Sequence, residues 1–325
     1  MIIGLTYDLR DTYLKMGFSG EEAAEFDKEE TIIALEQAIE QAGFQTERIG
    51  NIFQLTDMLA QGKRWNLVFN ISEGVYGQAR EAQVPALLDA YKIPYVFSGP
   101  LTLTLSLDKA YTKMILHHEG VQTHNFMRIE QWGKYEPQQL NYPLFVKPVA
   151  EGTGKGISNA SKVTNPQQFS DEVQRLLQLY KQPVIAEQYL PGKEFTVGII
   201  GTGEDAEVLG SMEIIPKQQK QDLIYGFAVK EDYENFVDYA LASGSHVNEM
   251  EAMALKCYTI LGCEDAGRVD IKLDVNGNPC FMEINPLAGL NPIHSDLPIL
   301  CRLKGIPYND LIKKILDSAI NKIGR

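Results

Sequence analysis

Residues 266–298 read AGRVDIKLDVNGNPCFMEINPLAGLNPIHSDLP, and two segments of this stretch have the pattern of β-strands. Arg268 to Leu273 alternates polar and apolar residues, whereas Cys280 to Ile284 is mostly apolar. The Asn-Gly pair at 276–277 lies between them and is typical of a β-hairpin turn. The sequence therefore predicts an antiparallel hairpin.

This hairpin is expected to collect oxygen ligands on one face. Pairing of the strands brings Asp270 near Glu283, and Asn285, two residues further on, points to the same side. Such oxygens are the hard ligands that Mg²⁺ takes when it also binds nucleotide phosphates. Arg268 shares the face of Asp270, and a permanent cation there suits an anionic transition state. The alternative is an exposed hairpin with ordinary surface charges, which does not explain why it runs into an irregular Pro-Leu-Ala-Gly segment.

Composition limits the classes of function. The chain has 325 residues, enough for two or three domains, with 44% hydrophobic and 22% charged residues, as in globular proteins. Its net charge of −13 argues against nucleic acid or an anionic membrane as the main partner. A negatively charged cofactor would therefore need local cations or Mg²⁺.

The cysteines and the N-terminus indicate a cytoplasmic protein. The four cysteines show no CxxC spacing and are expected to be reduced core residues: Cys257, Cys263, Cys280 and Cys301. Met1 leads directly into a strand, without a signal peptide. No run approaches the roughly 18 apolar residues of a membrane span.

The N-terminal part alternates strands with helices. Strands are expected at 2–7, 45–49, 67–71 and 93–96, and helices at about 28–43, 52–61 and 81–91. This order predicts a small parallel sheet with helices on both faces, ending at a boundary near residues 98–100. No GxGxxG motif follows the first strand, so a dinucleotide site is unsupported.

The remaining chain is expected to form mixed α/β structure. Helices are predicted at about 102–106, 108–119, 166–181, 247–261 and 308–321. Strands are predicted at 125–129, 144–147 and 183–186, followed by an antiparallel sheet up to residue 215. Residues 217–245 are polar without clear periodicity and are interpreted as a functional flap.

A glycine loop and two lysines suggest an anion site. The loop EGTGKG at 151–156 lacks the P-loop pattern, yet three glycines leave N–H groups able to approach phosphate. Lys147 ends an apolar strand and would cost free energy there unless an anion paired with it. Lys109 begins a helix and fits a solvated surface lysine equally well. Glu187 and Glu194 flank a turn and are able to accept hydrogen bonds from a nucleoside.

Five segments, in this order and spacing, resemble the D-alanine–D-alanine ligase family of the ATP-grasp superfamily. They are DKAYTK (108–113), FVKPVAEGTGKGIS (145–158), EQYLPGKEFTVGI (187–199), GRVDIKLD (267–274) and MEINPLAGLNPIHS (282–295). The resemblance implies an α/β (α+β mixed) ATP-grasp fold with three domains, at 1–99, 100–186 and 187–325. The first would hold a Rossmann-like parallel sheet, and ATP would lie between the other two.

The resemblance also implies an activity and a set of site residues. The activity is ATP-dependent joining of a carboxylate to an amine, with ADP and phosphate as products. The implied ATP ligands are Lys109, Lys147, Glu187, Leu190, Glu194 and Lys230. Two Mg²⁺ ions, or Mn²⁺, would be held by Asp270, Glu283 and Asn285. The implied catalytic and substrate residues are Arg268 and the Gly289 N–H as oxyanion site, with Glu25, Thr153 and Ser295.

Departures from the family pattern fall on the parts that bind amino acids. Thr153-Gly154 replaces the usual Ser-Ser, Glu231 stands where a Tyr usually follows the flap lysine, and NISEGVYGQAREAQVP (70–85) replaces a GEDG-like segment. The leading hypothesis is therefore an ATP-dependent ligase of small amino-acid-like substrates. The alternatives are D-alanine–D-alanine ligase itself, a kinase-like enzyme and a nucleotide-binding regulator without catalysis. Family members are commonly dimers, which makes a homodimer one possibility, and the net charge of −13 leads us to expect neither nucleic acid nor membrane as a partner.

Overall fold

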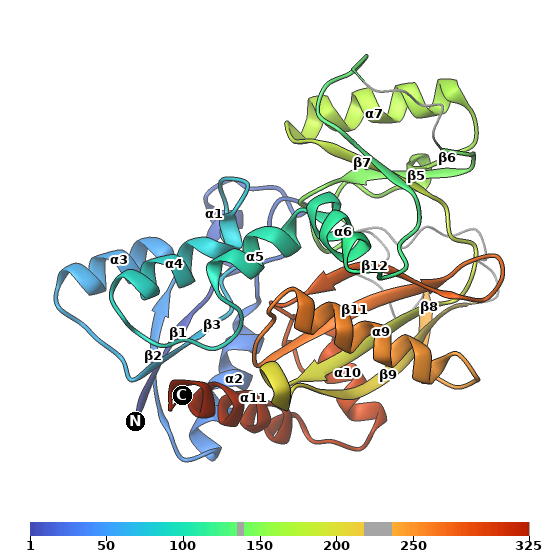
Figure 1. Cartoon of the computed structure of the whole chain (residues 1–325). Coiled ribbons are helices and arrows are strands. Elements are labelled where there is room, and N and C mark those ends of the chain that lie inside the picture. Colours follow the sequence, from blue (N-terminus) through green and yellow to red (C-terminus); the bar gives the residue numbers. More distant parts are fainter. Residues whose placement is uncertain (135–139, 218–235, 325) are drawn as a thin grey trace.

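A computed structural model describes residues 1–134, 140–217 and 236–324 (Figure 1). Its strands form three sheets, each contributed by a different part of the chain. The first sheet holds β1 (Ile2–Thr6), β2 (Gln45–Gly50) and β3 (Leu67–Asn70), all parallel, in the order β2-β1-β3. The helices α2 (Glu29–Gln41), α3 (Ile52–Ala60) and α4 (Gln83–Ala90) alternate with these strands, as predicted.

Two features of this N-terminal part differ from the prediction. The strand expected at 93–96 is reduced to a single bridge between Tyr95 and Val68. Pro94 has no N–H to donate to the sheet. Lys92 and Phe97 have positive φ angles, so the extended backbone ends before and after this bridge. A short helix, α1 (Arg10–Lys15), was not expected, and the residue predicted to precede the first helix, Glu25, lies between α1 and α2.

The second sheet is antiparallel and holds β4 (Phe126–Ile129), β5 (Leu144–Pro148), β6 (Lys162–Val163) and β7 (Val184–Gln188) in the order β4-β7-β5-β6. It packs against α7 (Pro166–Tyr180) through a buried apolar cluster. Two helices, α5 (Pro100–Leu107) and α6 (Lys109–His118), connect it to the first sheet. The Asp108 carboxylate caps α6 by accepting the N–H groups of Ala110 and Tyr111.

The third sheet is also antiparallel, with the order β10-β9-β8-β11-β12. Its strands are β8 (Glu194–Ile200), β9 (Glu207–Pro216), β10 (Val237–Leu241), β11 (Ala266–Leu273) and β12 (Pro279–Asn285). The helix α9 (Val247–Ile260) covers one face, and α10 (Asp296–Leu303) and α11 (Tyr308–Ile323) follow β12. Short 3-10 turns occupy Arg80–Ala82, Asn159–Ser161 and Gly203–Asp205.

Two elements of this C-terminal part were missed from sequence. The strand β10 lies inside the segment that was interpreted as an irregular flap, and it forms because β9 supplies a partner along its whole length. The helix α10 was also missed, because most of its residues are buried and its sequence is apolar almost all round. The predicted flap residue Lys230 lies outside the described residues.

The last helix, α11, packs against α2 rather than against the β8–β12 sheet alone (Figure 1). Buried residues of both helices and of β1 and β3 belong to one apolar core. The four cysteines are buried and unpaired, as predicted. None of the helices in the described ranges combines the length and the apolar character that crossing a membrane requires.

Candidate active site

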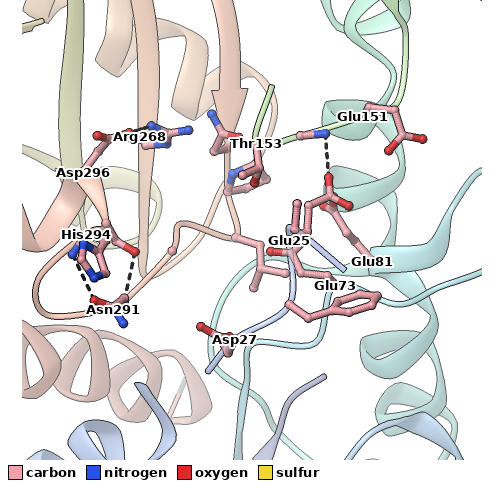
Figure 2. Close-up of a pocket in the computed structure, with 18 of the residues that line it drawn as sticks. Glu25, Asp27, Glu73, Glu81, Glu151, Thr153, Arg268, Asn291, His294 and Asp296 are labelled. Atoms are coloured by element: carbon pink, nitrogen blue, oxygen red, sulfur yellow. Dashed lines mark hydrogen bonds and ion pairs between the residues drawn. The ribbon is translucent and has the colours of Figure 1, made fainter. Parts of the chain in front are cut away.

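Two neighbouring cavities lie where the three sheets meet. One, of about 230 Å³, is lined by β5, β7, the β7–β8 turn and the β11–β12 hairpin. The other, of about 280 Å³, is lined by residues 24–28, the glycine loop and the segment after β12 (Figure 2). Both cavities are lined by Lys109, Glu151, Gly152, Thr153, Arg268, Glu283 and Asp296. They therefore form one continuous candidate site.

The β11–β12 hairpin has the geometry that the sequence predicts. Asp270 lies directly opposite Glu283, and the Asn285 amide donates to Asp270 Oδ2 at 3.3 Å. Thr196 of β8 donates to the other oxygen, Oδ1, at 2.8 Å. Arg268 Nη2 lies 3.5 Å from Asp270 Oδ2. Two carboxylates and an amide oxygen on one surface fit a Mg²⁺ ion, which accepts hard oxygen ligands and completes its shell with water or phosphate.

Both predicted lysines are buried at this surface. Lys109 Nζ donates to the Glu151 carbonyl at 2.7 Å and lies 3.6 Å from Glu283. It is therefore not a solvated surface lysine. Lys147 Nζ lies 3.3 Å from Glu187 and 3.8 Å from Glu283. Burial opposes its charge, but these carboxylates outweigh burial and raise the pKa of Lys147. The Lys147 ammonium is thus held in the charged form beside the hairpin.

A third buried lysine, Lys113, received no role from sequence and belongs to the same charge cluster. Lys113 Nζ donates to Glu187 Oε1 at 2.8 Å and contacts His124 Nε2 at 3.1 Å. Burial lowers the pKa of Lys113 to about 8, partly offset by Glu187. Burial disfavours the Glu187 carboxylate too, yet Lys113 and Lys147 hold its pKa well below the usual range. Lys113 lies one helical turn after Lys109, so both side chains were predictable as lying on the same face of the helix.

The glycine loop differs from the prediction that its N–H groups are free for phosphate. The Gly152 N–H donates to Glu25 Oε1 at 2.6 Å, and the Gly156 N–H donates to Glu21 at 3.3 Å. These contacts could not be seen in sequence because the two carboxylates come from a distant segment. Thr153 has a φ of +50°, which is strained for a β-branched residue and is typical of functional loops.

Glu25 is the centre of a buried ionic network that binds the glycine loop to the N-terminal part. Lys155 donates to Glu25 at 2.7 Å and pairs with Glu151 at 2.6 Å. Arg80 donates to both Glu25 oxygens at 3.2 Å and to the Ala150 carbonyl at 2.8 Å. Burial opposes ionisation of Glu25, but Arg80 and Lys155 outweigh it and lower its pKa to about 2. Arg80 was missed because only the fold brings it to the loop.

Three further carboxyl groups line the larger cavity beside this network: Asp27, Glu73 and Glu81 (Figure 2). Burial raises the pKa of Glu81 to about 7, against the attraction of Arg80. Burial likewise raises the pKa of Asp27 to about 7, and burial together with Glu81 raises that of Glu73. Within the described ranges, Glu73 and Glu81 make no ion pair. This wall of the cavity therefore gathers three carboxyl groups whose charged forms burial disfavours.

The opposite wall is formed by the loop after β12. Asn291 fixes this loop, since its Oδ1 accepts the N–H groups of Ile293 and His294 at 2.9 and 3.0 Å. Its own N–H donates to Ser295 Oγ at 3.0 Å. Gly289 is required here because a Cβ would lie 2.8 Å from that hydroxyl oxygen. Two of the predicted oxyanion and substrate residues, Gly289 and Ser295, are thus brought together in this loop.

Asp296, the first residue of α10, pairs with Arg268 Nη1. Sequence reasoning gave Asp296 no role, although it follows the quoted family segment directly. The remaining predicted nucleotide residues line the smaller cavity: Leu190 is buried, and Glu194 pairs with Lys272 at 3.2 Å.

Comparison with known proteins fits this geometry. The family model described as "D-ala D-ala ligase C-terminus" matches residues 113–317. A D-alanine--D-alanine ligase from Bordetella pertussis is 32% identical over 273 residues, covering 83% of this chain and 82% of that protein. The chain belongs to the D-alanine–D-alanine ligase family. A relative from Thermotoga maritima with the same name is 30% identical over 290 residues, 89% of this chain and 91% of its own length.

Two other similarities extend this result. An uncharacterized protein, y4sG, from Sinorhizobium fredii is 31% identical over 258 residues, 78% of this chain and 74% of its own. The solved structure of a D-alanine--D-alanine ligase from Bacillus anthracis complexed with ATP matches with a TM-score of 0.76 at 21% identity, covering 99% and 98% of the two chains. At that identity the match establishes the ATP-grasp fold, as predicted.

Within this family member, the predicted catalytic and metal residues lie in two groups, and Glu25 is a separate case. The phosphate and metal candidates, Lys109, Lys147, Asp270 and Glu283, lie together at the hairpin. Those proposed for the oxyanion and acceptor line the larger cavity: Arg268, Gly289 and Ser295. The side chain of Glu25 lies at the same cavity but is engaged by Gly152, Lys155 and Arg80, so its role toward a substrate ammonium stays a prediction.

Proposed function

We propose that this chain is an ATP-dependent carboxylate–amine ligase that activates its first substrate as an acyl phosphate. The observation that carries the proposal is the shared lining of the two cavities. Lys109, Arg268 and Glu283 face both, so a nucleotide in the smaller cavity would present its phosphates to a carboxylate in the larger one. A regulator that only binds nucleotide has no need of this second, connected cavity.

The proposed first step is phosphoryl transfer to the carboxylate oxygen, releasing ADP. The lysines at 109 and 147 would neutralise phosphate charge, and the nucleoside would lie between Glu187, Leu190 and Glu194. Asp270, Glu283 and Asn285 would hold the Mg²⁺ ions, whose charge stabilises the transferring phosphoryl group when they are bound. A carboxylate repels nucleophiles, whereas an acyl phosphate carries a good leaving group.

The proposed second step is attack of the amine on the acyl carbon. A C–N bond forms, the C–O bond to phosphate breaks, and the amine proton passes to solvent. Arg268 and the Gly289 N–H would stabilise the tetrahedral oxyanion, which favours this step over a kinase-like reaction. Thr153 and Ser295 would orient the substrates. The three domain boundaries, a homodimer and a cytoplasmic location stay predictions.

D-alanine–D-alanine ligase proper is the second candidate, because several relatives carry that name. The deciding experiment measures phosphate release from Mg·ATP with single and paired D- and L-amino acids, and identifies the products by mass. Turnover with D-alanine alone, giving the dipeptide, would support the second candidate. Turnover with a different pair would support a ligase with other substrates. A stable phosphorylated product, or no turnover with any pair, would contradict the proposed function.

A further inference from the structure

His124 lines the smaller cavity beside the carboxylate of Glu187. The backbone is fixed on both sides of this histidine. Thr123, which precedes it, forms a bridge with β12, and the Asn125 carbonyl, which follows it, accepts an N–H from β7 at 2.8 Å. His124 is only 8% exposed. The imidazole is therefore a fixed part of the cavity wall.

Within the described ranges, the imidazole has polar partners at one nitrogen only. Nε2 lies 3.1 Å from Lys113 Nζ and 3.3 Å from Glu187 Oε1, whereas Nδ1 is buried without a hydrogen-bond partner. Burial and the charge of Lys113 lower the pKa of His124, so the ring is neutral near pH 7. A neutral ring at this place either donates to Glu187 or accepts from Lys113. Both contacts help to fix the same carboxylate oxygen.

The two oxygens of Glu187 have different surroundings. Oε1 is buried and lies between Lys113, at 2.8 Å, and the imidazole of His124. Oε2 lies 3.3 Å from Lys147 and, since a carboxylate oxygen accepts about two hydrogen bonds, it keeps an acceptor position for a ligand. The same cavity is lined by apolar side chains, on which a planar base would stack: Phe145, Leu190 and Met282. The polar edge of a base in this cavity would therefore meet an oxygen that only accepts.

We propose that His124 is a positioning residue that makes the nucleotide site select a base with an amino group on the edge facing Glu187. This inference rests on the ATP-dependent function proposed above. By fixing Oε1, His124 leaves Oε2 as the oxygen that accepts from the base. A 6-aminopurine donates to it, whereas a 6-oxopurine brings an oxygen against the carboxylate and leaves both groups unpaired. Without the imidazole, Lys113 alone holds Oε1, so the carboxylate turns more freely and discriminates less.

The test compares two nucleotides that differ in the base edge. Dissociation constants of Mg·ATP and Mg·ITP are measured by calorimetry on the full chain without amino acids, because inosine carries an oxo group in place of the 6-amine of adenosine. We expect the wild type to bind ATP at least about tenfold more tightly than ITP, the effect of one unpaired buried polar group. His124→Leu removes both ring nitrogens and should reduce this ratio to about threefold or less. His124→Met tests the same point if the leucine variant folds poorly.

Two control variants separate this role from mere filling of space. His124→Gln should keep the wild-type ratio, because its amide both donates and accepts close to the place of Nε2. His118→Leu, at an exposed histidine in the last turn of α6, should also leave the ratio unchanged.

Equal wild-type affinities for the two nucleotides would overturn the inference. An unchanged ratio in His124→Leu, or a glutamine variant as unselective as the leucine variant, would do the same. Binding of neither nucleotide would overturn the proposed function together with this inference. Selective ATP binding without phosphate release from any amino-acid pair would contradict the ligase function and leave the inference about His124 standing.

Discussion

The carboxyl group of Glu81, which makes no ion pair within the described ranges, leads to a quantitative prediction about stability. Burial raises its pKa from 4.5 to about 7 in the folded chain. An acid with a raised folded-state pKa stabilises the fold at low pH, and this contribution disappears as pH rises from about 4.5 to about 7. At 1.36 kcal/mol per pKa unit, the loss amounts to about 3 kcal/mol, which is an upper value because Glu81 is partly exposed.

Replacing Glu81 by Gln removes this penalty, because the amide stays neutral at all pH values. We expect the variant to unfold about 5 °C above wild type near pH 8.5, from roughly 2 °C per kcal/mol in a chain of this size. Near pH 4.5 the two proteins should melt together. Thermal unfolding of ligand-free protein, followed by circular dichroism across this pH range, measures the difference.

Glu25→Gln is the matched control because Glu25 lies in the same network but is paired. Arg80 and Lys155 would lose their common partner, so this variant should melt below wild type at pH 8.5, by about 3 kcal/mol of unfolding free energy. The reasoning is wrong if Glu81→Gln destabilises the protein at alkaline pH, or if its melting difference from wild type is the same at both ends of the range.

Three further predictions concern other buried charges. Lys113→Met should cost about 3 kcal/mol of stability and weaken ATP binding, because Glu187 loses its shortest ion pair; unchanged melting and nucleotide titration would contradict this. Asp270→Asn keeps the side-chain shape and should raise the Mg²⁺ concentration for half-maximal phosphate release about tenfold or more, and an unaltered Mg²⁺ dependence would refute the metal assignment. Asp265→Ala should cost about 3 kcal/mol, since its buried carboxylate accepts from the Phe97 N–H at 2.7 Å and from Lys322 at 2.9 Å; a loss of melting temperature below about 1 °C would argue against it.

The sequence predicted structure correctly where neighbouring residues determine it. The β11–β12 hairpin follows from one Asn-Gly turn and strand alternation, and the register then places Asp270 opposite Glu283 without further information. The pairing shifts directly after Asp270, however, so that Met282 has no direct partner and instead lines the smaller cavity. Such a bulge depends on the partner strand and leaves no periodic signal.

The site contacts that the sequence did not predict join residues that are far apart in the chain. Arg80 reaches Glu25, and Lys155 of the glycine loop reaches the same carboxylate over 130 positions. Asp296 pairs with Arg268 only because the fold places the start of α10 beside β11. A pattern in one sequence shows that a residue is charged, but not which opposite charge the fold brings to it.

The contact between α2 and α11 has a consequence for biosynthesis. The core under the parallel sheet includes Leu311, Ile315 and Leu316, which a ribosome adds more than 200 residues after β3. The first ~100 residues therefore emerge while this part of their core is still absent, although α2 is already present. Apolar surface that is transiently exposed in this way makes a nascent chain prone to aggregate. Premature termination before residue 308 would remove the contribution of α11 and leave that surface exposed.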